Sequence, residues 1–179
     1  EAISLMCSKM DNSDDLVIGS ISVDYEGGEN LYGWLPESDK KYYTNKTERK
    51  IHAIDEIQMA LNIHVSASAK LWRLDVIKQY AIEFPKGLLF EDSNFYWKYL
   101  SVAPHVHIIK ESVYLYQRHL TGSIMSNALN KKSGIAIQHL YIIDDLYLYL
   151  RERVSVIVCH KILENIYEPY FWFAYNNSP

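Results

Sequence analysis

The chain has 179 residues, of which 49% are hydrophobic and 22% charged, a composition typical of one globular domain that buries a core without staples. Its net charge of -4 and pI near 6.0 argue against nucleic-acid binding, because such proteins normally present a basic face. Cys7 and Cys159 lie far apart without neighbouring ligand residues, which indicates neither a disulfide framework nor a zinc site. No apolar run approaches the roughly 20 residues of a membrane span. We therefore expect a soluble protein of a reducing compartment.

The first half of the chain alternates helix and strand signals. Apolar residues at helical spacing predict a helix within residues 1–11, and the β-branched run at 16–25 predicts a buried strand. Gly27-Gly28 favours a hairpin turn, followed by short extended segments up to residue 45. Isoleucines at intervals of three predict an amphipathic helix over 47–62.

The second half continues this alternation up to residue 117. Residues 66–73 are predicted as a strand and 74–81 as a short helix that ends before the Phe84-Pro85 turn. A helix follows over 93–100. The segments VHIIK and VYLYQ then predict two strands around a turn at Glu111-Ser112.

The last fifty residues predict a helical pair, over 131–152 and 154–168, with the second helix ending near Pro169. Tyrosines gather in YIIDDLYLYL and YEPYFWFAY. Aromatic stripes at helical spacing usually belong to a core. The alternative is an exposed patch that binds a partner or a membrane surface.

Two adjacent carboxylates, Glu91 and Asp92, follow the apolar stretch FPKGLLF and precede the helix predicted over 93–100. One interpretation makes Asp92 the N-cap of that helix, because Asp is among the commonest capping residues. The other makes it a catalytic base. Adjacent helical residues point about 100° apart, so the two carboxylates cannot share one proton and their roles should differ.

The order of motifs around this pair resembles the second half of bacterial family-2 glycosyltransferases of the GT-A type. That family has an Asn-Lys-Leu-Tyr-Arg-Arg segment, then Phe-Pro-Glu-Gly and a Glu-Asp pair, then Tyr-x-Tyr-Arg followed by Ser-Ile. The chain matches these motifs with KLWR at 70–73, FPKG at 84–87, ED at 91–92, YLYQR at 114–118 and SI at 123–124. The resemblance implies an α/β fold, α+β-like as a fragment, with a short mixed sheet and a C-terminal helical pair. It covers residues 1–126, with 127–179 as a helical extension.

The resemblance also implies roles for individual residues. Asp92 is the base that takes a proton from the acceptor hydroxyl, and Glu91 holds the acceptor or the loop. Lys70 and Trp72 lie on the acceptor side, where Trp72 stacks on a sugar ring or, equally, packs in the core.

Two further residues follow from the same resemblance. Arg118 binds the diphosphate or, structurally, pairs with the acidic residues. His119 approaches the metal or diphosphate, or else is a loop histidine exposed to solvent. His105 and His107 alternate along a strand edge, which favours a surface position.

The family's nucleotide-binding half, with its D-x-D motif for a divalent Mn or Mg ion, has no match in this sequence. We therefore expect a fragment that binds neither metal nor nucleotide-sugar tightly by itself, and whose unpaired sheet edge favours a homo-oligomer. The intact protein would transfer a sugar from a nucleotide-sugar donor to a glycan or lipid-linked acceptor in cell-surface polysaccharide synthesis. It would be cytoplasmic and peripheral to the inner membrane face. The alternative is a non-catalytic interaction module that binds through its aromatic C-terminal helices.

Overall fold

The computed structural model describes residues 1–25, 43–118 and 134–179, with the side chains of Tyr25 and Arg118 left out. The predicted hairpin at Gly27-Gly28 and the Ser123-Ile124 match lie outside these ranges. The described elements, in chain order, are α1 (Ala2–Lys9), β1 (Leu16–Tyr25), β2 (Arg49–His52), α3 (Ile57–Leu61), β3 (Lys70–Trp72), α4 (Leu74–Gln79), α5 (Glu91–Val102), β4 (His105–Arg118), the 3-10 turn η2 (Ile135–Ile137), α7 (Gln138–Arg153) and α8 (Val156–Asn177).

The described strands form one mixed sheet in the order β2-β4-β1-β3. The central pair, β1 and β4, is parallel, and the outer strands β2 and β3 each run antiparallel to their neighbour. This mixed sheet with helices confirms the predicted α/β class. The strand predicted over 16–25 is confirmed as β1, but it is an internal strand rather than a sheet edge.

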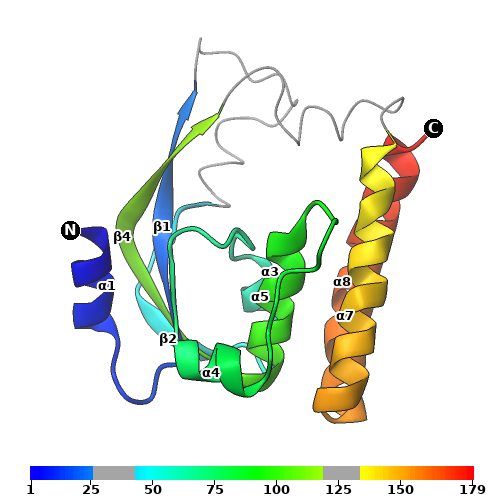
Figure 1. Ribbon diagram of the computed structural model, residues 1–179. Helices are drawn as coiled ribbons and strands as arrows, with labels where there is room; N and C mark the ends of the chain where they lie inside the picture. Colours follow the sequence, from blue (N-terminus) through cyan, green and yellow to red (C-terminus); the bar gives the residue numbers. More distant parts are fainter. Residues whose placement is uncertain (26–42, 119–133) are drawn as a thin grey trace.

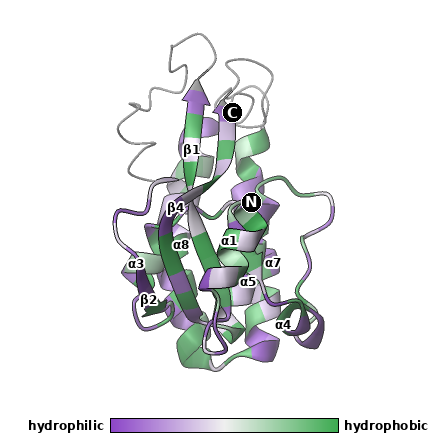
Figure 2. Ribbon diagram, turned by 90° about the vertical axis from the view of Figure 1, so that its left-hand side faces the viewer, coloured by the Kyte–Doolittle hydropathy of each residue, from purple (hydrophilic) through white to green (hydrophobic). Residues whose placement is uncertain are grey.

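Helices cover the sheet in layers (Figure 1). Helix α1 lies on one face, and α5 lies on the other, with α7 and α8 packed side by side beyond α5. In Figure 2 the face of the sheet that carries α1 is turned toward the viewer. Among the described residues, no helix combines the length and the apolar character needed to cross a bilayer.

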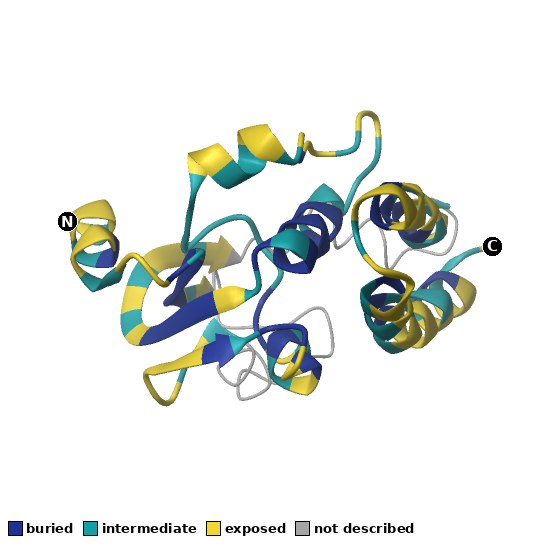
Figure 3. Ribbon diagram, turned by 90° about the horizontal axis from the view of Figure 1, so that it is seen from below, coloured by how far each residue is buried: buried dark blue, intermediate teal, exposed yellow. Residues whose placement is uncertain are grey.

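The two faces of the sheet bury different clusters because successive strand residues point to opposite sides. Leu16 and Ile18 of β1 face the main core beneath α5, whereas Val17 between them packs with Met6 of α1. Helix α5 is buried on nearly every side, as Figure 3 shows, because the sheet, α4 and the α7/α8 pair surround it. Packing on these neighbours therefore fixes residues 93–101 of α5 in place.

The prediction of two strands around a turn at Glu111-Ser112 is wrong, because β4 is one strand of 14 residues. The register against β1 shifts on both sides of Ser20, which pairs with Ser112. Such an irregularity is a β-bulge, where extra residues of one strand face fewer residues of the other. The Ser20 hydroxyl donates to the Lys110 carbonyl at 3.0 Å. Pairing with β1 thus keeps Glu111 and Ser112 within a bulged strand, although these polar residues resemble a turn in the sequence.

The helix predicted over 47–62 is also wrong. Residues 49–52 form β2 and pair with β4, and only residues 57–61 are helical. Ile51, Ile54 and Ile57 are nevertheless all buried. The apolar spacing correctly predicted which residues are buried. Residues 49–52 are nevertheless extended, because they pair with the open edge of β4.

Helix α8 does not end near Pro169 but continues through it to Asn177. Proline costs a helix interior one hydrogen bond. Contacts beyond it hold the C-terminal half in place: the Tyr170 hydroxyl bonds to Ser93 of α5, and Phe173 packs on His139 with ring centroids 4.4 Å apart. The aromatic residues divide between core and surface, since Tyr149 is buried whereas Tyr167 and Trp172 are exposed.

Candidate functional site

Helix α5 begins at Glu91, so Asp92 lies in its first turn and is not its N-cap. The N-cap is Phe90, in the left-handed conformation with φ 65°, and no side chain caps the helix. Two contacts fix this unusual start: the Leu89 N–H donates to Gln138 Oε1 at 2.6 Å, and the Phe90 ring packs on His139 at 4.0 Å. The capping interpretation of Asp92 is therefore wrong. Its half-buried carboxylate lies at the positive end of the helix and makes no capping hydrogen bond.

Lys70, at the start of β3, faces this helix start from the sheet. Its ammonium donates to the His64 carbonyl at 2.7 Å, to the Ser66 carbonyl and to His64 Nδ1 at 2.9 Å. It also lies 5.4 Å from the centre of the Tyr96 ring of α5, in cation–π geometry. Burial lowers the pKa of Lys70 well below its usual range, and the charge of Asp92 opposes this effect. Asp92 is thus an electrostatic counterpart of this enclosed amine.

His64 completes the arrangement and is wholly buried. Its Nε2 lies 3.2 Å from the Gly19 carbonyl of β1, while its Nδ1 receives the Lys70 bond. These partners fit a neutral ring with its proton on Nε2. Burial, together with the Lys70 charge, lowers the pKa of His64 from 6.5 to about 3. His64 is therefore neutral, and its Nδ1 serves as an acceptor for the Lys70 amine.

The bulge in β4 brings the strands close at the same place. A Cβ added to Gly19 would lie 2.4 Å from Cγ2 of Val113, so only glycine fits without a shift. Asn45 spans the sheet here, because its N–H donates to Ser20 Oγ at 2.8 Å and its Nδ2 to the Ile109 carbonyl at 2.9 Å. Gly19 is therefore required by the same packing that seats His64.

Trp72 lies at the end of β3 and packs into the main core. Its ring meets Phe95 at 5.2 Å and Tyr99 at 4.7 Å, both edge to face. These contacts favour core packing over sugar stacking. Next to it, Arg73 bonds to the Asp14 and Asp11 carbonyls at 2.6 Å and 2.7 Å. The KLWR segment thus joins sheet, helix and N-terminal loop.

Fewer contacts are described for the remaining predicted residues. Glu91 lies beside Asp92 in the first turn of α5. Arg118 ends β4 and pairs in register with Tyr25, its side chain being outside the description. His119 lies outside the described residues. Of the predicted site residues, the structure therefore brings Lys70 within electrostatic range of Asp92.

The prediction for His107 is wrong, since it lies on a central strand and is buried. Its Nδ1 lies 3.0 Å from the Lys9 carbonyl and its Nε2 3.2 Å from Glu48 Oε1. His105, in contrast, is exposed at the start of β4.

Sequence reasoning did not select His64 or Gly19. Neither stands in a recognisable motif, and His64 lies in a short connection before β3. A buried lysine needs acceptors close by in space, but the sequence does not say which ones. His64 lies only six residues before Lys70, so this one contact is short-range in sequence.

A divalent Mn or Mg ion, which the fold family implies, prefers several oxygen ligands. Within residues 1–25, 43–118 and 134–179, no group of three or more His, Cys, Asp or Glu side chains is arranged to hold a metal ion. The described residues therefore do not fit such a site.

No family model matches the chain, and no curated protein matches it significantly. Two crystal structures of S. aureus TarS 1-349, one in complex with UDP and one with UDP-GlcNAc, align with a TM-score of 0.57 each, at 15% and 16% identity. TarS is a family-2 glycosyltransferase. The alignments cover 98% of this chain and 43% and 44% of TarS. The chain thus has the fold of part of a glycosyltransferase and spans less than half of the TarS chain.

Proposed function

We propose that this chain is the acceptor-side, catalytic-base half of a GT-A glycosyltransferase, with Asp92 as the base. The observation that carries the proposal is the position of Asp92: an uncapped carboxylate in the first turn of α5, opposite the enclosed amine of Lys70. A half-buried carboxylate that does not cap its helix is free to accept a proton from a bound hydroxyl. The fold shared with TarS supports the same assignment.

In the proposed reaction, the oxygen of an acceptor hydroxyl attacks the anomeric carbon of a nucleotide-sugar. The new carbon–oxygen bond forms as the bond to the diphosphate breaks, and the nucleoside diphosphate leaves with the electron pair. The hydroxyl proton passes to Asp92. Attack opposite the leaving group inverts the anomeric centre, so one carboxylate suffices as the base.

Supporting roles follow from placement. Lys70 positions the base through its charge, since its hydrogen bonds go to His64 and Ser66 rather than outward. Glu91 contacts the acceptor or holds the loop before α5, and Arg118 and His119 serve the diphosphate side.

The donor, a Mn or Mg ion and the D-x-D motif belong to the nucleotide-binding half of the intact enzyme. The acceptor is a glycan or lipid-linked glycan in polysaccharide synthesis, at the cytoplasmic side of the membrane.

The test is Asp92→Asn in an enzyme that includes the nucleotide-binding half. Asn keeps the size of the side chain but does not accept the proton, so transfer should fall by about 10²-fold or more. Loss of the charge at the helix start should cost about 0.3–1 kcal/mol of stability. Transfer is followed by the release of nucleoside diphosphate, with donor affinity measured separately.

Asp75→Asn is the matched control, because Asp75 is an exposed carboxylate in the first turn of α4. It removes the same charge from a similar helix position without affecting the site, and transfer should stay unchanged. Near-normal transfer by Asp92→Asn would reject Asp92 as the base.

A second candidate function rests on the exposed aromatic residues of α8. Tyr167, Phe171 and Tyr175 form a row of near-parallel rings with centroids 5.9 Å and 6.1 Å apart, and Trp172 lies against the last two. Such a surface suits an interaction module that binds a partner or a membrane surface. Absence of sugar transfer by the wild-type protein with its nucleotide-binding half would favour this alternative.

A further inference from the structure

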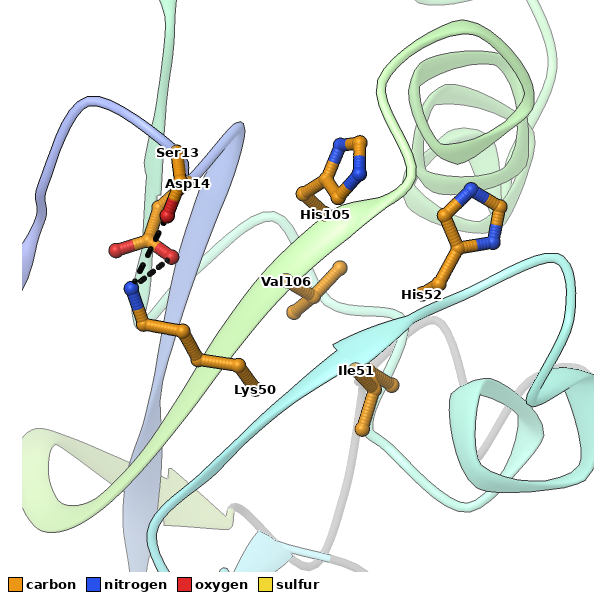
Figure 4. A pocket seen from close by; sticks show the side chains of 7 residues that line it. All are labelled: Ser13, Asp14, Lys50, Ile51, His52, His105 and Val106. Atoms are coloured by element: carbon orange, nitrogen blue, oxygen red, sulfur yellow. Dashed lines mark hydrogen bonds and ion pairs between the residues drawn. The ribbon is translucent and has the colours of Figure 1, made fainter.

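Two histidines from neighbouring strands meet at the end of the sheet where β4 begins. His52 ends β2 and His105 starts β4, and the antiparallel register places them directly opposite each other. Their ring centroids are 5.2 Å apart with the planes at 82°. Figure 4 shows both rings beside the same small pocket, which is also lined by Ser13, Asp14, Lys50, Ile51 and Val106. The pairing of the strands thus holds two imidazoles within reach of one ligand.

Each ring is oriented by a carboxylate at its Nδ1. Asp15 Oδ2 lies 3.0 Å from His105 Nδ1 and also accepts the backbone N–H of His105 at 3.0 Å. Asp55 Oδ2 lies 2.9 Å from His52 Nδ1, which also accepts the Asp55 backbone N–H at 3.3 Å. The Asp15 contact favours a proton on Nδ1 of His105, which leaves the lone pair of that ring on Nε2. For His52 to bind a ligand through Nε2, its Nδ1 carries the proton and donates it to Asp55 Oδ2 in place of accepting the Asp55 N–H. A carboxylate behind an imidazole is the arrangement that orients histidine ligands of metals.

The two Nε2 atoms are open to a ligand. The His52 and His105 side chains are 38% and 60% exposed, and neither Nε2 has a hydrogen-bond partner within the part of the chain that the structure describes. Lys50, the cation lining the pocket, is bonded to Asp11 at 2.6 Å and to Asp14 at 2.8 Å. Its charge is therefore balanced and does not repel a metal ion.

We propose that His52 and His105 bind one divalent transition-metal ion, of the class of Zn²⁺, Ni²⁺ or Cu²⁺, through their Nε2 atoms, with water completing the coordination. Imidazole suits these ions, whereas Mg²⁺ and Ca²⁺ prefer oxygen ligands. Asp15 and Asp55 hold the rings as second partners. The site lies beyond the C-terminal end of α5, a helix of 12 residues and thus about 18 Å long, whereas Asp92 lies at its start. The proposal is therefore independent of the proposed transfer reaction.

The experiment is a calorimetric titration of the chain with Zn²⁺, with Mg²⁺ as the comparison ion. We expect one Zn²⁺ per chain at this site and no Mg²⁺ binding there. His52→Ala and His105→Ala should each weaken Zn²⁺ binding by about 10-fold or more, and Asp55→Asn by about 10-fold through loss of the second partner. Zn²⁺ should also raise the melting temperature of the wild type, because it bridges β2 and β4 only in the folded chain.

The matched control is His160→Ala. His160 is also exposed and lies 3.5 Å from a carboxylate oxygen, that of Glu164 on the same helix, and it should leave the titration unchanged. The double variant His52→Gln/His105→Gln provides a second test, with circular dichroism to verify folding. Zn²⁺ binding that is equally strong in the double variant, or that is lost in His160→Ala, would overturn the proposal.

Discussion

Replacing His64 by Gln should flatten the acid dependence of stability. The buried ring is neutral in the folded chain, where its pKa is lowered from 6.5 to about 3 by burial and by the Lys70 charge. The unfolded chain takes up a proton near pH 6.5 that the folded chain refuses. Because stability rises with pH wherever the unfolded state binds more protons, this group lowers stability as the pH falls below 6.5.

The size of the effect follows from the same two values. Each pH unit between 6.5 and about 3 costs about 1.4 kcal/mol. At pH 5 the wild type should therefore have lost about 2 kcal/mol through His64 alone, and near pH 3 about 5 kcal/mol. Such losses are large against a typical domain stability of about 5–15 kcal/mol.

Gln is the suitable replacement because it accepts and donates without titrating. Its oxygen can take the Lys70 bond and its amide can donate toward the Gly19 carbonyl. Urea unfolding of both proteins at pH 7, 6 and 5, followed by circular dichroism, gives the difference. The window avoids carboxylates such as Glu48, whose pKa is lowered by its bond to Lys9 and whose contribution is lost at more acid pH.

His139 titrates in the same direction, with a pKa lowered by burial to about 4. It is present in both proteins, so its contribution cancels in the comparison. An equal loss of stability between pH 7 and pH 5 in wild type and His64→Gln would refute the assignment of a neutral, buried His64.

Two further predictions concern packing beneath the site. Gly19→Ala places a Cβ 2.4 Å from Val113 Cγ2 and should lower the free energy of unfolding in urea by about 1–3 kcal/mol. Adding Val113→Ala to the same chain should restore part of this loss. Strictly additive effects of the two substitutions would contradict the clash. Trp72→Ala should cost about 3 kcal/mol, because its ring packs on Phe95 and Tyr99. A loss below about 1 kcal/mol would instead favour an exposed, sugar-stacking Trp72.

The amino-acid sequence alone predicted the elements whose own residues decide their conformation. The β-branched run at 16–25 is β1, and the short amphipathic segment after Arg73 is α4. The motif order around Glu91 and Asp92 also indicated a glycosyltransferase fold, with which the TarS likeness agrees. These signals are local, because propensity and periodicity act over a few residues.

Tertiary structure decided where several segments compete for the same partner. Residues 49–52 form a strand because they pair with backbone groups at the open edge of β4. Glu111 and Ser112 likewise lie in a bulged strand and not in a turn. Helix α8 passes Pro169 because its far half packs on α5 and α7. In each case contacts distant in sequence outweighed a local preference of about 1–3 kcal/mol.

The chemistry of the candidate site depends on the same distant contacts. The sequence placed Asp92 beside a helix start, but the backbone around Phe90 determined that it is not the cap. It likewise showed Lys70 without His64, whose ring reaches across to the Gly19 carbonyl of β1. Charge and pKa depend on burial and on neighbours in space. For that reason the sequence was enough to select Asp92 as the candidate carboxylate, whereas the Lys70–His64 cluster near it forms only in the folded chain.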